Sequence, residues 1–173
     1  VNNLQAAGIM VVAAAGNDGP KCATIHEAPA QYAGFAFTVG AIDDLTGKVA
    51  EFSSRGPSTF NGQLVPEIMA PGVNVRSSTP GGHYAKMGWQ GTSMSAPHVV
   101  GAVALLWSAH PELIGQIDLT KNILRKTADA RSTSEGCGGS QGRVPNNTYG
   151  YGVLNVYRAM QALKSGNFSL QNP

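Results

Sequence analysis

The segment Gly8-Ile9-Met10-Val11-Val12-Ala13-Ala14-Ala15 is a continuous apolar run with no alternation of polar residues. This pattern is typical of a strand that is covered on both faces, as in parallel sheets. The run ends at a strong turn signal, Gly-Asn-Asp-Gly-Pro, at residues 16–20. Residues 1–8 resemble the end of a helix closed by a glycine. Because a natural chain seldom begins inside a helix, we expect residue 1 to be the edge of a cleaved or truncated piece.

Working outward from this strand, the remaining apolar runs predict an α/β fold. We expect a buried central helix at residues 93–109, which is apolar nearly all round, and two amphipathic helices at 119–126 and 155–163. Pro/Gly turns separate the other expected strands, which are 35–42, 49–53, 67–70, 73–77 and 84–89. The prediction is a parallel sheet packed against one buried helix.

Composition and charge exclude two classes of partner. The chain has 12 Lys+Arg against 10 Asp+Glu in 173 residues, with no basic run and no aromatic-basic stripe. Nothing therefore points to nucleic acid or to an anionic membrane surface. The longest apolar stretches, 9–15 and 99–107, fall well short of the ~18–20 residues that span a bilayer.

The two cysteines, Cys22 and Cys137, lie among turn-forming residues rather than in apolar runs. That placement favours a disulfide between them, with free surface thiols and a metal role as the alternatives. A disulfide would imply an oxidising compartment, and so a secreted protein. Two weak glycosylation sequons begin at Asn146 and Asn167.

The segment Gly91-Thr92-Ser93-Met94-Ser95-Ala96-Pro97-His98 places a serine at the entrance of the buried helix. The N-terminus of a helix presents unpaired N–H groups and a partial positive charge, which stabilise a developing oxyanion. A serine at the start of a helix is also a common N-cap. Without its neighbouring residues, the N-cap role would be the expected one.

The segment resembles the block around the nucleophile of the subtilisin family of serine proteases (subtilases). Residues 13–17, Ala-Ala-Ala-Gly-Asn, are similar to that family's strand and turn with the oxyanion asparagine, and 52–56 and 69–73 also resemble family segments in the family's order. The resemblance covers residues 1–163, as the C-terminal part of a subtilisin-like catalytic domain, and leaves 164–173 as a tail. Segments 53–58, 73–78 and 146–152, with the two cysteines, resemble secreted enzymes of the bacillopeptidase F kind.

The resemblance implies roles for particular residues. Ser93 would be the nucleophile, Asn17 the oxyanion-binding side chain and Thr92 a further hydroxyl donor. The implied substrate-binding positions are Glu27, Gly16, Ala14 and Gly91. Glu27 near the base of the S1 pocket would favour Lys or Arg at P1, with a solvated loop glutamate as the alternative. The chemistry requires no cofactor. A structural calcium or monovalent cation is implied only weakly, at the backbone carbonyls of Ala30, Tyr32 and Phe35.

A general base is what the sequence lacks. The family uses an Asp and a His in segments that do not occur here. None of His26, His83, His98 and His110 suits the role, since each reads as a surface or structural histidine. We therefore expect a serine endopeptidase fragment that acts on proteins or peptides and is inactive without the missing N-terminal part. The alternative is a non-catalytic remnant that binds peptides or self-associates.

Overall fold

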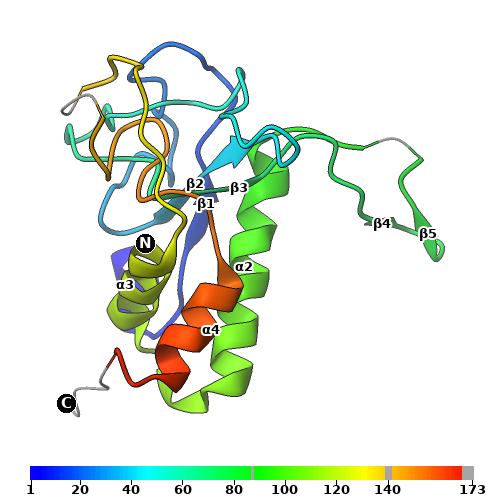
Figure 1. Ribbon diagram of the computed structural model, residues 1–173, viewed down its shortest axis with the longest axis vertical. Helices are drawn as coiled ribbons and strands as arrows, with labels where there is room; N and C mark the ends of the chain where they lie inside the picture. The colour runs from blue at the N-terminus through cyan, green and yellow to red at the C-terminus, as the bar shows by residue number, and fades with distance from the viewer. Residues whose placement is uncertain (87, 139–141, 169–173) are drawn as a thin grey trace.

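The computed structural model describes residues 1–86, 88–138 and 142–168 (Figure 1). The elements are α1 (Asn2–Ala6), β1 (Val12–Ala14), β2 (Phe37–Ile42), β3 (Ile68–Pro71), β4 (Ser78–Thr79), β5 (His83–Tyr84), α2 (Thr92–Ala109), the short 3-10 helix η1 (Pro111–Leu113), α3 (Ile117–Thr127) and α4 (Val156–Lys164). The predicted α/β class is confirmed. Of the predicted tail, residues 169–173 lie outside the described residues.

The central sheet has the order β1-β2-β3, and both pairings are parallel. Ala14 lies opposite Val39, and Val39 lies opposite Ile68. The outer edge of β3 is covered by a bridge between Met69 and Val153. The outer edge of β1 has no strand partner within the described part of the chain. The sheet can therefore be extended on the β1 side.

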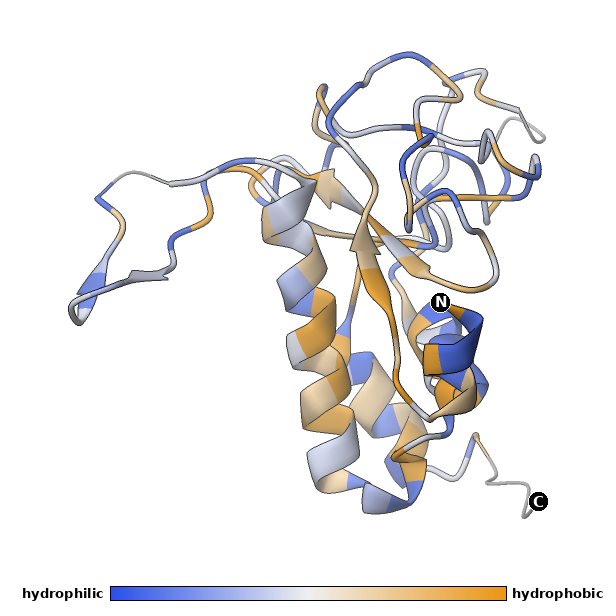
Figure 2. Ribbon diagram, turned by 180° about the vertical axis from the view of Figure 1, so that it is seen from behind, coloured by the Kyte–Doolittle hydropathy of each residue, from blue (hydrophilic) through white to orange (hydrophobic). Residues whose placement is uncertain are grey.

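Helices cover one face of the sheet and loops cover the other. Alternate residues of β2, Phe37 and Val39, pack in one cluster with Val99 and Leu106 of α2 and with residues of α3 and α4. On the opposite face, smaller clusters pack Ala13 and Met69 against loop residues. Figure 2 shows the hydrophobic colour on the central strands and on parts of the helices. Every residue of β2 is buried, as expected of a central parallel strand.

The prediction that the long helix is buried all round is wrong. One side of α2 packs on all three parallel strands, but Val100 is 51% exposed and Leu105 is 59% exposed on the other side. Gly101 and Ala104 on the same side are also exposed. A helix that is apolar all round needs a second covering layer, and the described chain supplies only one. None of the described helices is long and apolar enough to cross a membrane.

Three predicted strands are also wrong, in whole or in part. Residues 49–53 form only a bridge from Val49 to Ile42, and 73–77 form only a bridge from Val75 to Trp89. In place of a strand at 84–89, the chain makes the short antiparallel pair β4–β5, which projects from the body of the molecule (Figure 1). Residue 87 of that expected strand lies outside the described residues.

Arg55 explains why residues 49–53 do not form a strand. Its side chain is 2% exposed, and its Nη1 donates to the carbonyls of Ala50, Glu51 and Ser53. Its Nε and Nη2 reach the two carboxylate oxygens of Glu135, each at 3.2 Å. One buried guanidinium therefore binds carbonyls that would otherwise pair with a neighbouring strand, and it holds the segment in a tight turn.

A disulfide joins Cys22 to Cys137 and closes the same loop region, as the sequence predicted. The Asn147 side chain adds a hydrogen bond of 2.8 Å to the carbonyl of Cys137. The neighbouring Asn146 is 4% exposed and its Nδ2 donates to the carbonyls of Arg131 and Arg143. That burial leaves no access for glycosylation of Asn146 in the folded chain, whereas Asn167 is exposed.

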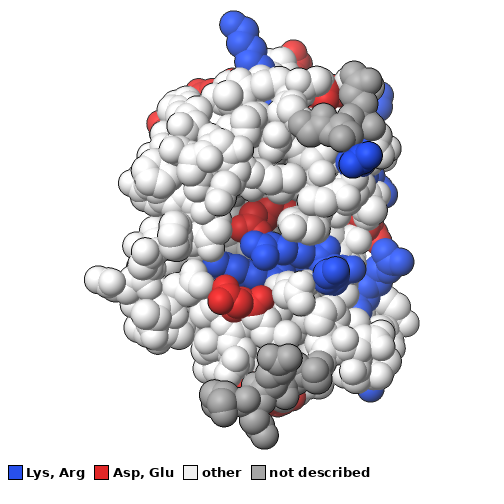
Figure 3. Space-filling view, turned by 90° about the vertical axis from the view of Figure 1, so that its left-hand side faces the viewer, with Lys and Arg blue, Asp and Glu red and all other residues white. Residues whose placement is uncertain are grey.

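Several basic side chains of the described residues lie beside carboxylates. Figure 3 shows Lys and Arg side chains in a band across one face, with carboxylates on either side. Arg125 pairs with the buried Glu67, and Arg158 pairs with Asp129 at 2.8 Å. Burial raises the pKa of Glu67, and the positive charge of Arg125 opposes that rise.

Candidate active site

Ser93 lies at the second residue of α2, where the helix backbone presents unpaired N–H groups. Gly91 is the N-cap, with a φ of 144° that side-chain-bearing residues rarely adopt. The N–H of Thr92 donates to Asn17 Oδ1, and the N–H of Met94 donates to the carbonyl of Gly91. Among the described residues, the N–H of Ser93 has no such partner. Ser93 is an exposed residue.

Asn17 follows β1 and reaches the same helix N-terminus. Its Oδ1 accepts from the Thr92 N–H at 2.9 Å and from the Thr92 hydroxyl at 3.1 Å. Both contacts fix the amide so that Nδ2, its only donor, remains for another acceptor. A Cβ on Gly91 would lie 3.7 Å from that Nδ2, so the donor sits beside the N-cap of α2. The geometry places a free amide donor and a free backbone N–H at one helix end.

Thr92 itself is completely buried. Its hydroxyl lies 3.2 Å from the Gly16 nitrogen and 3.3 Å from the Gly16 oxygen, in addition to the contact with Asn17 Oδ1. These contacts make Thr92 a residue that positions Asn17. Its predicted role as a direct hydroxyl donor to the oxyanion stays a prediction.

Ser93 opens into a groove of about 400 Å³. The groove runs between the N-terminal turns of α2 and the base of the projecting β4–β5 arm. Its other lining residues are Val75, Arg76, Ser77, Trp89, Met94, Pro97 and His98. An exposed serine that lines a partly apolar groove suits a peptide as ligand.

The side-chain contacts of the histidines in the described part of the chain do not involve Ser93. His98 Nδ1 lies 2.8 Å from the carbonyl of Met94, one helical turn back. His110 contacts Glu112 at 3.0 Å, and His26 lies 3.8 Å from Asp18. His83 lies in β5 on the arm. No histidine hydrogen bond to Ser93 occurs in the described ranges.

The predicted substrate-binding residues lie in two places. Ala14 ends β1 and is half-buried, and Gly16 and Gly91 lie beside Asn17 and Thr92. Glu27 lies in the loop after Asn17, is exposed, and forms no ion pair with the described residues. Gly16 and Gly91 thus lie beside Asn17 and Thr92, Ala14 precedes them on β1, and Glu27 is exposed in the loop after Asn17. Their roles in substrate binding stay predictions.

The three carbonyls suggested for a cation do not offer a free set of ligands. Ala30 O accepts from the Thr38 hydroxyl at 2.8 Å, and Tyr32 O accepts from two backbone N–H groups. Phe35 O accepts from the Lys121 ammonium at 2.9 Å. Because each of these three carbonyl oxygens already accepts a hydrogen bond, they do not fit a bound cation. The described chain also has no cluster of three or more His, Cys, Asp or Glu side chains that could hold a metal.

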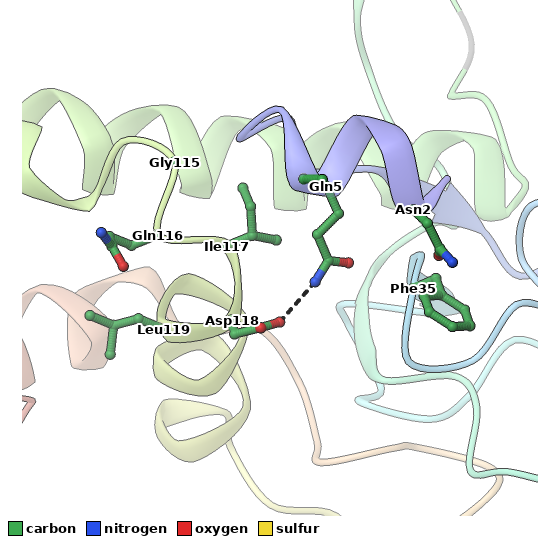
Figure 4. A pocket seen from close by; sticks show the side chains of 9 residues that line it. Asn2, Gln5, Phe35, Gly115, Gln116, Ile117, Asp118 and Leu119 are labelled. Atoms are coloured by element: carbon green, nitrogen blue, oxygen red, sulfur yellow. Dashed lines mark hydrogen bonds between the residues drawn. The ribbon is translucent and has the colours of Figure 1, made fainter. Parts of the chain in front are cut away.

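Lys121 is a buried cation that the sequence did not reveal. It lies on α3, is 1% exposed, and its ammonium also contacts Gly34 O and Gln5 Oε1, each at 3.2 Å. Figure 4 shows Gln5 of α1 directed at Asp118 of α3, with Phe35 at the same pocket. Burial lowers the pKa of Lys121, and the nearby carboxylates of Glu67 and Asp118 oppose this.

A model of the subtilase family matches residues 1–152, and the chain therefore belongs to the subtilase family. Its α/β architecture is the subtilisin-like fold. The chain is 42% identical over 131 residues to bacillopeptidase F of Bacillus subtilis (strain 168), covering 76% of this chain and 8% of that protein. It is 36% identical over 159 residues to subtilisin BL of Lederbergia lenta, covering 92% of this chain and 49% of that one.

Solved structures agree with this assignment. A mutant of the protease domain of PatA superposes with a TM-score of 0.69 at 26% identity, over 97% of this chain and 53% of that one. The maturation protease PagA gives a TM-score of 0.66 at 28% identity, over 94% of this chain and 53% of that one. The chain thus spans about half of each of these structures.

Proposed function

We propose that this chain carries the nucleophile and the oxyanion-binding groups of a secreted serine endopeptidase. The observation that supports this most directly is the arrangement of Asn17, whose Oδ1 is bound twice by Thr92 so that Nδ2 stays free beside the N-terminus of α2. The Nδ2 and the Ser93 N–H would then donate to the same developing oxyanion. Export is supported by the Cys22–Cys137 disulfide, since such bonds persist in oxidising compartments.

In the proposed reaction, Ser93 Oγ bonds to the carbonyl carbon of a peptide, and the carbonyl oxygen takes up the negative charge. The hydroxyl proton passes to a general base and then to the leaving amine as the C–N bond breaks. Water hydrolyses the resulting ester, releases the acid and restores the Ser93 hydroxyl. The substrates would be proteins or peptides lying in the groove beside Ser93.

The general base would come from an amino-terminal portion of the subtilase domain, in the same polypeptide or as a separate chain. Two features support a docking place for it. The exposed side of α2 carries Val100 and Leu105, and the outer edge of β1 is unpaired within the described ranges. Strand edges and apolar helix faces of this kind are normally covered. Without that portion, we expect the chain to be inactive.

A fluorophosphonate probe tests the proposal, because it labels a serine only where the hydroxyl is activated. The chain is treated alone and together with the amino-terminal portion of its own catalytic domain, and labelling is located by peptide mass spectrometry. We expect Ser93 to react only in the combined sample. Labelling of the chain alone would show that a base is present after all.

The second candidate is a non-catalytic remnant that binds peptides or self-associates. The same exposed side of α2 and the open β1 edge favour it, since either can accept a second copy of the chain. Under this reading no sample reacts with the probe. Sedimentation would instead show concentration-dependent oligomers, which addition of the amino-terminal portion does not dissociate.

Glu27 is proposed as the residue that selects Lys or Arg at P1. Its exposed carboxylate lacks an ion-pair partner among the described residues and so can bind a substrate cation. In the combined enzyme, which is this chain together with the amino-terminal portion of its catalytic domain, Glu27→Gln should lower the preference in kcat/KM for Lys over Leu. The expected loss is roughly 10- to 150-fold, because a hydrogen bond to a charged group contributes roughly 1.5–3 kcal/mol. Glu51→Gln, on another exposed loop residue, is the control. Equal rates on Lys and Leu substrates in the unmodified enzyme would contradict the role.

A further inference from the structure

Ser54 makes hydrogen bonds to backbone groups on both sides of Asn17. Its N–H donates to the carbonyl of Gly16 at 2.9 Å, and its Oγ accepts from the N–H of Asp18 at 3.1 Å. Ser54 is completely buried. One side chain and its own backbone therefore fix the residue before and the residue after Asn17.

The position of Gly16 shows how closely the Asn17 turn approaches Ser54. A Cβ on Gly16 would lie 2.9 Å from Ser54 Oγ, closer than real Cβ contacts. Its φ of 104° is in addition a conformation that favours glycine. The turn that carries Asn17 is thus shaped around the Ser54 hydroxyl.

Ser54 is itself held by the core of the fold. The preceding Ser53 accepts from the N–H of Ala41 in β2 at 3.0 Å. The following Arg55 binds the carbonyls of its own turn and the carboxylate of Glu135. The N–H of Gly19 donates to the carbonyl of Phe52 at 2.8 Å. The segment 52–55 is therefore a rigid support that links the Asn17 turn to the central sheet.

We propose that Ser54 is a positioning residue for oxyanion binding, which holds the backbone of Asn17 while Thr92 holds its side chain. The proposal rests on the proposed function. Thr92 can orient the amide but cannot fix the turn that carries it, and an oxyanion donor is effective only when it is preorganised. A misplacement of ~1 Å can cost ~10² in rate.

The test uses the combined enzyme and the variant Ser54→Ala. We expect kcat to fall by about 10-fold with KM nearly unchanged, because the loss is confined to the transition state. In an Asn17→Ala background the same change should have no further effect on kcat, since Ser54 acts through Asn17. An additive loss in the double variant, or an unchanged kcat in the single one, would overturn the proposal.

Ser58→Ala is the matched control. Ser58 is also a buried loop serine, 3% exposed, whose Oγ accepts from the N–H of Phe60 and donates to the carbonyl of Gln31. It should lower the thermal midpoint to a similar degree and leave kcat unchanged. If Ser58→Ala lowered kcat as much as Ser54→Ala does, the loss would be a result of lower stability, and the proposal would be overturned.

A second readout does not need activity. In the chain alone, labelled with ¹⁵N-asparagine, the Asn17 side-chain amide resonances are assigned by their loss in Asn17→Asp. We expect Ser54→Ala, but not Ser58→Ala, to shift or broaden them. If the combined enzyme is inactive, the proposed function fails, and this measurement alone decides the role of Ser54. Unshifted resonances in Ser54→Ala would overturn it.

Discussion

Replacing Ser93 with alanine is expected to abolish peptide hydrolysis by the combined enzyme without unfolding it. In subtilisin itself, loss of the nucleophile lowers kcat by about 10⁶-fold, and we expect a loss of that order. The side chain is exposed and its removal breaks no hydrogen bond among the described residues, so the fold should tolerate the change. Steady-state hydrolysis of a chromogenic peptide, with the thermal midpoint measured in parallel, checks both parts.

Ser77→Ala provides the control, because Ser77 lines the same groove. It should change kcat/KM modestly at most. A Ser93→Ala variant that kept its rate would identify another nucleophile, and active-site titration with the fluorophosphonate would then locate it.

Asn17→Asp is expected to have the second largest effect. The aspartate keeps an oxygen acceptor for the Thr92 N–H and hydroxyl, so the contacts at 2.9 and 3.1 Å can persist. It removes the Nδ2 donor and places a negative charge beside the developing oxyanion. Removing the corresponding donor of subtilisin costs about 10²–10³ in kcat, and we expect at least that loss.

The kinetic signature separates this role from a structural one. Because the donor binds only the transition state, kcat and kcat/KM should fall together while KM stays nearly constant. Asn122→Asp, an exposed position on α3, introduces the same charge elsewhere and should leave kcat unchanged. A rise in KM with a constant kcat in Asn17→Asp would contradict the oxyanion role.

The sequence predicted the elements whose signal lies in continuous apolar runs. The apolar runs correctly indicated β2 and α2, and the helix entrance at Ser93 was identified because its motif is local. The exposure of Val100 and Leu105 could not be predicted, since it depends on which layers cover α2 and not on the helix itself.

Contacts between a side chain and a backbone group far away in the sequence could not be predicted, because they leave no pattern in the sequence. Nothing in the spacing of Ser54 and Asn17 indicates that the serine bonds to both neighbours of the asparagine. Residues 49–53 have strand-like composition, yet a single guanidinium from Arg55 binds their carbonyls. Such contacts depend on the tertiary fold, which overrides local β propensity.

The ammonium of Lys121 at the Phe35 and Gly34 carbonyls has a consequence for the conditions under which the fold persists. An ion held only by protein oxygens stabilises a protein in proportion to the logarithm of its free concentration, and a chelator or dilution removes it. The positive charge of Lys121 is covalently part of α3, so dilution or a chelator cannot remove it from the Phe35 and Gly34 carbonyls.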